Sequence, residues 1–325
     1  MLQKIRQPIQ SELELFDSYV AEQFSCDSPL MGEMLSLAIS SRGKGLRPTL
    51  AMLSAAIHSP QNHIGERAWV AAMMSEMIHL ASLIHDDVID NSSLRRGQST
   101  LNAQWQSRNA ILTGDYILGR TLSLGLKSGY YDVVTHLSGV ISTLCEGEVI
   151  QAHYVSTLDL DFEGYINIVE KKTSSLIAAS CSAGAIASVA SPEKVEAITR
   201  YGNYIGIAFQ MQDDILDFCP SSKSGKPSNN DLREGKITLP LLLLLEESTP
   251  QESAQIKAML SACGEDESQV AKLQLLIEES SALPRAREIM EEYIQKALLI
   301  LEQYPQSVYR DSLTLLTRFI TEREV

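Results

Sequence analysis

The sequence is poor in the features that mark disulfide-linked, nucleic-acid-binding and secreted proteins. It contains 27 Lys and Arg against 41 Asp and Glu, and the resulting net charge of −14 argues against a nucleic-acid partner. The N-terminus lacks the apolar core and cleavage site of a signal peptide. Its cysteines form no CxxC pair, which favours buried thiols in a reducing compartment: Cys26, Cys145, Cys181, Cys219 and Cys263. We therefore expect a cytoplasmic protein.

Long hydrophobic runs are also missing. Residues 174–191 carry no charge but are mostly Ala and Ser, and the leucine run at 241–245 ends at Glu246. Because a bilayer span needs about 20 strongly apolar residues, we expect no integral membrane segment.

What is abundant is apolar spacing typical of helices. The 325 residues are 44% hydrophobic, with only 11 prolines, and no alternating strands or hairpin dipeptides are evident. Helices are expected over residues 10–23, 29–39, 49–58, 65–91, 101–106, 109–127, 131–154, 161–190, 193–218, 239–247, 251–263, 267–280, 283–304 and 307–324, with a polar loop over 221–230. The pattern predicts an all-α protein, a large helical bundle forming a single domain over 1–325.

The segment around which we organise the chain is an apolar helix that ends in the acidic sequence DDVID. Asp86 and Asp90 are four residues apart and share one helix face, while Asp87 lies about 100° away. Closely spaced carboxylates repel one another unless a cation lies between them, and their oxygens suit Mg²⁺. The alternative is a solvated acidic helix end.

A second acidic motif repeats this spacing. Asp213, Asp214 and Asp217 in DDILD follow another apolar helix, again at positions i, i+1 and i+4. Two such motifs far apart in the sequence indicate two carboxylate clusters that hold one polyanion through shared metal ions.

With these two motifs, the chain resembles the trans-isoprenyl diphosphate synthases, or polyprenyl synthetases, most closely their long-chain bacterial members, over about residues 43–240. The resemblance implies the isoprenoid synthase type I fold with a central cavity, and a homodimer. It also implies Mg²⁺-dependent condensation of isopentenyl diphosphate with an allylic diphosphate, such as farnesyl diphosphate, to a long-chain all-trans polyprenyl diphosphate, with release of pyrophosphate. Roughly two or three Mg²⁺ ions per site would be held by all six aspartates, with Asp86, Asp90 and Asp213 placed nearest the chemistry.

The acceptor diphosphate needs cations. The sequence GKGLRP offers Lys44 and Arg47 at the start of a helix, where backbone amides also favour anions. The family usually has a bulkier, often basic residue at Gly45, so this glycine could loosen the loop or remove a contact. His79 lies two turns before Asp86, and in the resemblance it contacts isopentenyl diphosphate. An ordinary loop and a core histidine are the alternatives, and His85 is interpreted as structural.

Further positions match the family at diphosphate contacts. In the resemblance Arg95 faces the allylic diphosphate and Arg96 the acceptor diphosphate, and arginine suits both because it binds phosphate in a bidentate manner. The remaining matches are Lys172, Thr173, Gln210, Lys226 and Lys236, of which Lys172 and Gln210 are expected to act in catalysis. Phe209 could face a carbocation or lie in the core, Lys171 is expected to be solvated, Asp231 to order its loop, and Gly114–Tyr116, Glu148 and Gln151 to pack helices.

Product length is predicted from the turns that precede the first aspartates. Ala81 and Ser82 are small, where short-chain members of the family carry a bulky aromatic residue. The next side chains that would meet a growing chain are Ile78, Met77 and Met74. The expected product is longer than C20, in the range of about C30 to C40; close packing at Ala81 and Ser82 is the alternative.

Other classes on the same fold remain alternatives. These are a short-chain farnesyl or geranylgeranyl diphosphate synthase, a terpene cyclase, a head-to-head synthase and a non-catalytic subunit of a heteromeric enzyme. The DDILD motif argues against a cyclase, and the GKGLRP loop with His79 argues against head-to-head coupling. The complete set of six aspartates argues against an inert subunit.

Overall fold

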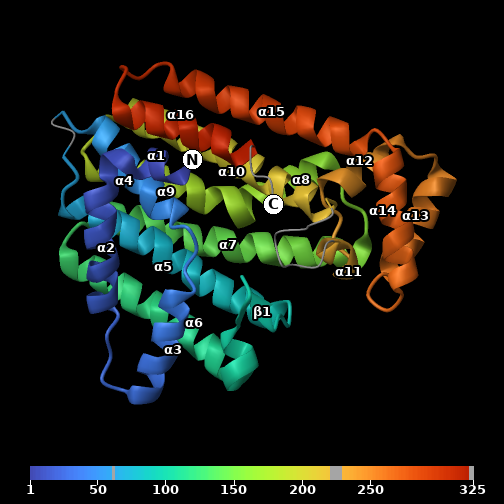
Figure 1. Cartoon of the computed structure of the whole chain (residues 1–325), viewed down its shortest axis with the longest axis horizontal. Helices are drawn as coiled ribbons and strands as arrows, with labels where there is room; N and C mark the ends of the chain where they lie inside the picture. Colours follow the sequence, from blue (N-terminus) through green and yellow to red (C-terminus); the bar gives the residue numbers. More distant parts are fainter. Residues whose placement is uncertain (61–62, 220–228, 322–325) are drawn as a thin grey trace. The chain divides into compact units, whose positions relative to one another are not determined.

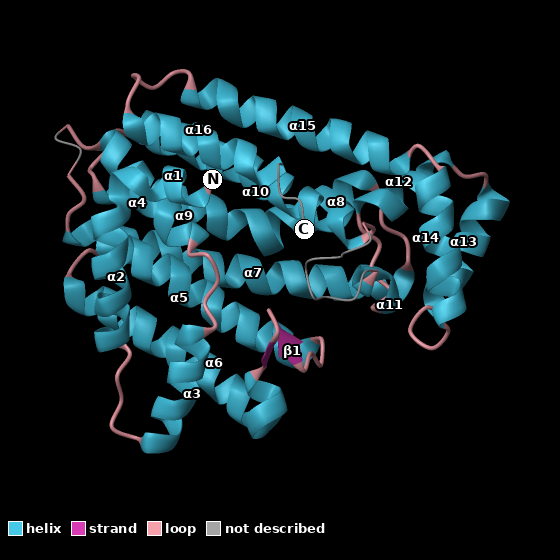
Figure 2. Ribbon diagram, in the orientation of Figure 1, coloured by secondary structure: helices cyan, strands magenta, loops and turns pink. Residues whose placement is uncertain are grey.

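Nearly every element of the protein is a helix. The computed structural model describes residues 1–60, 63–219 and 229–321, and Figures 1 and 2 show its helices. The chain divides into two compact units. Unit 1 comprises Met1–Ser142, Leu176–Gly202 and Ile300–Leu316, and unit 2 comprises Thr143–Ser175, Asn203–Leu299 and the segment from Thr317. The all-α prediction is confirmed, while the single domain over 1–325 stays a prediction.

Unit 1 is built around α5. Its elements are α1 (Leu2–Arg6), η1 (Gln7–Ile9), α2 (Gln10–Gln23), α3 (Pro29–Ser40), α4 (Leu46–His58), α5 (Glu66–Ile89), β1 (Leu94–Arg95), β2 (Gln98–Ser99), α6 (Leu101–Ser128), the first part of α7 (Tyr131–Thr157), most of α9 (Ser175–Ala187), the first part of α10 (Pro192–Asp217) and most of α16 (Val308–Thr321). Helix α5 packs against both α4 and α6. A Cβ on Gly125 of α6 would come within 2.8 Å of the Met74 sulfur, so the glycine permits this close approach.

Unit 2 contains the remaining parts of α7 and α10 together with a leucine-rich core. Its other elements are α8 (Phe162–Val169), η2 (Glu170–Ser174), α11 (Asn230–Arg233), α12 (Leu239–Glu247), α13 (Pro250–Ala262), α14 (Glu267–Glu279) and most of α15 (Ala282–Leu301). Residues 239–244 of α12 are all buried, and Thr249 and Glu252 form a capping box that begins α13.

Three local expectations need correction. The helix expected over 161–190 is interrupted by η2, a π-helical segment that divides α8 from α9. Strands β1 and β2 form a small antiparallel hairpin where none was expected. Helix α4 begins at Leu46, ahead of Pro48, because Gly45 takes the left-handed conformation, with φ of 55°, at its N-cap.

The two apolar segments noted in the sequence, 174–191 and 241–245, are mostly buried. Residues 176–185 of α9 and 239–244 of α12 are buried. Among the described residues, α7 is the one helix that is long and apolar enough to cross a membrane by length and composition, and a single such helix is weak evidence of a span.

Candidate active site

In unit 1, a tight turn sends two neighbouring arginines to different partners. Arg96 and Gly97 both have positive φ, 52° and 75°, and form the two-residue turn between β1 and β2. Before the turn, Arg95 donates from Nε to Oδ1 of Asp87 at 2.7 Å. The turn therefore gives the two guanidinium groups different partners within the protein.

Arg96 reaches the GKGLRP loop. Its Nη1 donates to the Ser41 carbonyl oxygen at 3.0 Å. A Cβ built on Gly43 would lie 2.5 Å from its Nη2 and 2.6 Å from its Cζ, so the guanidinium lies directly on the backbone of the loop. The structure thus places Arg96 beside the loop that carries Lys44 and Arg47.

The side chain of Arg47 has one N–H group for which no described residue supplies a hydrogen-bond acceptor. Its Nε atom is buried and has no hydrogen-bond partner among the residues of the structure's described ranges. Burial, opposed by Glu76, lowers the pKa of Arg47 to about 10, so the side chain remains charged at neutral pH. A buried cationic donor that lacks an acceptor is suited to an anionic oxygen.

His79 lies within electrostatic reach of the same cations. Burial, together with Arg47, Arg96 and Arg95, holds the pKa of His79 well below its usual value. The imidazole is therefore neutral at physiological pH, and it can donate one hydrogen bond without adding charge. The predicted acceptor residues Lys44, Arg47, His79 and Arg96 thus all belong to unit 1, three of them as one electrostatic cluster.

Glu76, which the sequence did not single out, is the acidic counterpart of this cluster. It is 5% exposed and interacts electrostatically with Arg47, Arg42, Arg96 and Arg6. Its only distinguishing mark in the sequence is the spacing of three residues to His79, which places both on one side of α5.

The first acidic motif closes α5, and its three aspartates differ in environment. Asp87 is buried and ion-paired to Arg95. Asp86 is half-buried, and Asp90, the C-cap residue, is exposed. Asp87 is thereby neutralised within the protein, while Asp86 and Asp90 lie where a cation from solvent can reach them.

The second motif, in unit 2, repeats this difference. Asp214 is 2% exposed and accepts hydrogen bonds from Tyr165 Oη at 2.7 Å, Gln210 Nε2 at 2.8 Å and the Leu239 amide at 3.3 Å. Asp213 is exposed. Asp217 accepts hydrogen bonds from the backbone amides of Asn230 and Asp231, both at 3.1 Å, and so satisfies the first two amides of α11. In both motifs the second aspartate is satisfied by the protein.

Thr173 and Gln210 are joined to Asp214 by hydrogen bonds. Thr173 Oγ1 donates to Gln210 Oε1 at 2.7 Å, which orients the Gln210 amide so that its nitrogen faces Asp214. Burial raises the pKa of Asp214, although its three donors favour the carboxylate. Tyr165, which has no signal in the sequence, is part of this network.

Lys172 is held by two residues that the sequence assigned only to helix packing. Its Nζ donates to Glu148 Oε2 at 2.9 Å and to Gln151 Oε1 at 2.7 Å. Lys172 lies in the π-helical segment η2. This segment packs closely on α7, because a Cβ added to Gly147 would lie 2.8 Å from the backbone nitrogen of Lys172. Glu148 and Gln151 thus fix the ammonium group, whereas Lys171 pairs with the exposed Glu146 at 2.6 Å.

A cavity of about 110 Å³ in unit 2 brings several predicted residues together. Lys172, Thr173, Gln210, Asp214 and Lys236 line it, together with Asp231. Lys236 pairs with Glu234, and its backbone amide donates to the Asp231 carbonyl at 2.9 Å. Lys226 lies outside the described residues, and Phe209 is half-buried.

The donor chemistry of both motifs fits Mg²⁺. Within residues 1–60, 63–219 and 229–321 no group of three or more metal-binding side chains is preassembled. Mg²⁺ does not require one, because it keeps several waters and is often bound by one or two carboxylates together with substrate phosphates. The carboxylates of Asp86, Asp90 and Asp213, which are half-buried or exposed, have the oxygen donors that such a site requires.

The residues predicted to set product length lie along α5. Met74, Met77, Ile78 and Ala81 are buried, and Ser82 is half-buried, with its hydroxyl bound to the His79 carbonyl at 2.9 Å. His85 packs on Gly114, whose added Cβ would meet the ring at 2.3 Å, in agreement with its structural interpretation.

Comparison with known proteins defines the class. The family model described as polyprenyl synthetase matches residues 28–278. Heptaprenyl diphosphate synthase component 2 of Geobacillus stearothermophilus is 34% identical over 297 residues, 90% of each chain. Octaprenyl diphosphate synthase of Escherichia coli is 30% identical over 324 residues, 99% of each chain. The crystal structure of a decaprenyl diphosphate synthase from Rhodobacter capsulatus has a TM-score of 0.92 at 28% identity and covers all of both chains. This protein belongs to the polyprenyl synthetase family.

Proposed function

We propose that the protein condenses isopentenyl diphosphate with an allylic diphosphate to give a long-chain all-trans polyprenyl diphosphate and pyrophosphate. The observation that best supports this proposal is the separation of Arg95 and Arg96: one guanidinium is bound at the DDVID motif, and the other lies on the GKGLRP loop. Two diphosphate substrates need two cationic sites of this kind, whereas a cyclase needs one.

The acceptor is proposed to bind in unit 1. Lys44, Arg47 and Arg96 would hold its diphosphate, with the unsatisfied Arg47 Nε donating to a phosphate oxygen. The neutral His79 would donate a hydrogen bond to the diphosphate without adding a further positive charge beside Arg47 and Arg96.

Ionisation of the allylic substrate is the difficult step, because charge develops on the departing diphosphate. Mg²⁺, when bound, stabilises that charge. We propose Asp86, Asp90 and Asp213 as its closest protein ligands, with Asp87, Asp214 and Asp217 completing the sites, some through water. That both motifs hold the same diphosphate stays a prediction from the sequence.

The cations of unit 2 are proposed to neutralise the leaving diphosphate. Lys172 is positioned for this by Glu148 and Gln151, and Thr173, Gln210 and Lys236 line the same cavity; Lys226 is proposed from its sequence match. The allylic cation then adds to the double bond of isopentenyl diphosphate, a carbon–carbon bond forms, and a proton is lost. No nucleophilic side chain is required.

A long-chain product is proposed from Ala81 and Ser82, and its exact length, like the best primer, is open to measurement. The names of two relatives, octaprenyl and decaprenyl diphosphate synthase, support a long chain. Another relative is named component 2 of a heptaprenyl diphosphate synthase, so a dependence on a second polypeptide is the alternative to test.

We further propose a homodimer in the cytoplasm. Helix α6 of unit 1 carries large apolar side chains that are open to solvent: Ile111 at 42%, Leu112 at 50% and Leu126 at 54% exposed. All five cysteines are free thiols, which supports a reducing compartment. The expectation that they are buried is correct for Cys181 and Cys263 and wrong for Cys145, which is exposed, while Cys26 and Cys219 are half-buried. Light scattering of the purified chain measures the dimer directly.

The decisive assay is release of pyrophosphate by the purified chain with Mg²⁺, isopentenyl diphosphate and farnesyl diphosphate. Release should require both substrates. Release without isopentenyl diphosphate would indicate a cyclase, and no release would indicate a subunit that needs a partner. Arg47→Ala should raise KM for isopentenyl diphosphate more than KM for the allylic substrate; the opposite pattern would reverse our assignment of the two sites.

A further inference from the structure

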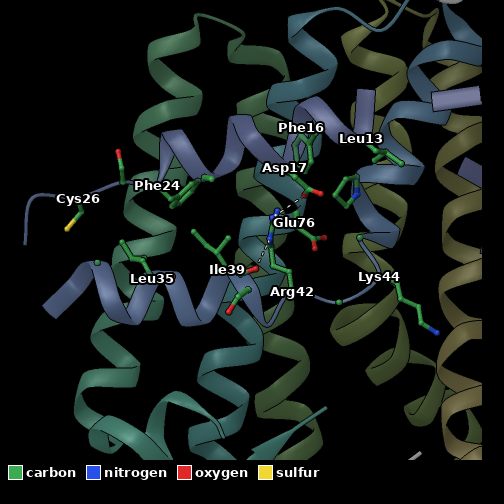
Figure 3. A pocket seen from close by; sticks show the side chains of 18 of the residues that line it. Leu13, Phe16, Asp17, Phe24, Cys26, Leu35, Ile39, Arg42, Lys44 and Glu76 are labelled. Atoms are coloured by element: carbon green, nitrogen blue, oxygen red, sulfur yellow. Dashed lines mark hydrogen bonds and ion pairs between the residues drawn. The ribbon is translucent and has the colours of Figure 1, made fainter. Parts of the chain in front are cut away.

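A second cavity, in unit 1, borders the GKGLRP loop of the proposed acceptor site. It has a volume of about 750 Å³ and lies between α2 and α3, with Glu76 of α5 at its inner side (Figure 3). Arg47, His79 and Arg96 do not line it, although Lys44 does. Its size lies within the range of about 300–1,000 Å³ typical of small-molecule sites.

One part of the cavity is apolar. Leu13, Phe16 and Phe24 line it from α2 and its C-cap, and Leu35 and Ile39 face them from α3 (Figure 3). The eleven-residue step from Leu13 to Phe24 corresponds to about 16 Å along a helix, at 1.5 Å per residue. An extended isoprene unit spans about one helical turn of 5.4 Å, so this wall matches about three such units.

The other part is charged, with cations in excess. Arg6 donates from Nε to Thr49 Oγ1 and from Nη2 to the Gly45 carbonyl, both at 3.2 Å, and neither acceptor is an anion. Within the described chain no carboxylate lies within ion-pair distance of Arg6. Arg42 pairs with the exposed Asp17 at 3.2 Å. Arg6 also interacts electrostatically with Asp17 and Glu76. The cavity is thus lined by three cationic side chains, Arg6, Arg42 and Lys44, against two carboxylates, Asp17 and Glu76.

This combination of an apolar wall and a cationic end fits one class of ligand. We propose that the cavity binds an anionic amphiphile, a prenyl phosphate or diphosphate, with its head at Arg6 and Arg42 and its chain between α2 and α3. The choice of a prenyl chain over a lipid acyl chain rests on the proposed function, because the enzyme itself would produce such molecules. The half-buried guanidinium of Arg6 supplies the charge that an anionic head requires.

Occupancy of this site would act on the acceptor loop. The bond from Arg6 Nη2 holds the carbonyl of Gly45, the N-cap residue of α4, whose first turn carries Arg47. A phosphate oxygen competes for that donor, since charge-assisted hydrogen bonds are stronger than those to a carbonyl. Binding of the amphiphile therefore weakens the acceptor site, and product accumulation raises KM for isopentenyl diphosphate.

The test measures binding of farnesyl monophosphate by calorimetry in EDTA, in an Asp213→Ala background that disables the proposed metal site. Ser36 lines the cavity from an exposed position on α3, so Ser36→Phe fills the cavity without crowding the core. Ser11→Phe, also exposed but outside the cavity, is the matched control. Ser36→Phe and Arg6→Gln should each weaken binding by about 10-fold or more, and Ser11→Phe should not change it.

Binding of three further ligands, compared with that of farnesyl monophosphate, identifies the class of ligand. Farnesol and inorganic phosphate should each bind at least about 10-fold more weakly than farnesyl monophosphate, since each lacks one half of the contacts. If dihexanoyl phosphatidic acid bound more tightly than farnesyl monophosphate, the proposal of a prenyl chain as the ligand would be wrong. Unchanged binding in both Ser36→Phe and Arg6→Gln would overturn the site itself. These results do not depend on turnover, so they stand apart from any failure of the proposed activity.

Coupling is tested on the otherwise wild-type enzyme. Added polyprenyl diphosphate should raise KM for isopentenyl diphosphate in wild type and Ser11→Phe. Ser36→Phe should keep the basal kcat and KM but lose this inhibition. Equal inhibition of Ser36→Phe and wild type would contradict regulation through the cavity.

Discussion

Replacing Gly43 by alanine tests whether the position of Arg96 on the GKGLRP loop serves acceptor binding. The new Cβ would lie 2.5 Å from Arg96 Nη2 and 2.6 Å from its Cζ. Ordinary contacts of this kind begin near about 3.5 Å, so the guanidinium must move by roughly 1 Å. That shift breaks its 3.0 Å bond to the Ser41 carbonyl.

We expect Gly43→Ala to weaken binding of isopentenyl diphosphate and to leave stability almost unchanged. In the proposed acceptor site, a hydrogen bond from Arg96 to the diphosphate contributes about 1.5–3 kcal/mol to binding, and we take the low end because Arg96 is exposed. KM for isopentenyl diphosphate should therefore rise by about 10-fold. Stability should change by no more than about 1 kcal/mol, because the displaced group is the end of a flexible side chain and Gly43 needs no left-handed backbone.

The assay is a double-mutant cycle in steady-state kinetics. Gly43→Ala should raise KM for isopentenyl diphosphate in the wild-type background and have no further effect in the Arg96→Ala background. Gly119→Ala, whose added Cβ meets nothing within 4 Å, is the control for the substitution itself. An equal effect of Gly43→Ala in both backgrounds would refute the reasoning.

Four further predictions concern the metal, Lys172, product length and pH. Asp86→Ala should lower kcat by at least ~10²-fold with the fold intact, since about 3 kcal/mol of charge stabilisation is lost; near-normal turnover would exclude it as a metal ligand. Glu148→Gln should lower kcat/KM by about 10-fold by releasing the ammonium it holds, while the exposed Glu146→Gln should not; equal effects would contradict this. Ala81→Phe should shorten the product seen by chromatography, once folding has been checked because overpacking costs about 1–3 kcal/mol; a folded, active variant with unchanged product would contradict the chain-length assignment. Folding lowers the pKa of His79, so the contribution of this residue to stability is present above about pH 6.5 and is lost as the pH falls below that value. Urea titrations at several pH values should show that acid lowers the free energy of unfolding less in His79→Gln than in the wild type. An identical decrease in both would show that the pKa of His79 is not lowered.

Much of the fold could be predicted because helix boundaries follow local rules. Apolar spacing gave residues 10–23 and 239–247 as helices with the bounds that the structure has. The hairpin was missed because its strands are two residues long, too short for any alternation, and Arg-Gly is not a usual dipeptide for its turn. The π-helical η2 was missed because apolar spacing does not separate it from an α-helix over five residues.

The site was predictable in its residues but not in its connections. The aspartates and arginines stand out by spacing and charge. That Asp87 pairs with Arg95, and that Asp214 is satisfied by Tyr165 and Gln210, depends on tertiary packing. Glu148 matches a family position, but its spacing in the sequence indicates only helix packing, because its bond to Lys172 forms through tertiary contacts.

Product analysis of the purified chain tests the central claim most directly. The chain is incubated with Mg²⁺, farnesyl diphosphate and isopentenyl diphosphate, and the dephosphorylated products are separated by chain length. The account predicts a polyprenyl product longer than C20, within about C30 to C40 at roughly one isoprene unit per helical turn of open pocket, with one pyrophosphate released per unit added and no product in EDTA. A product that stops at C15 or C20, or no product with both substrates and Mg²⁺ present, would contradict it.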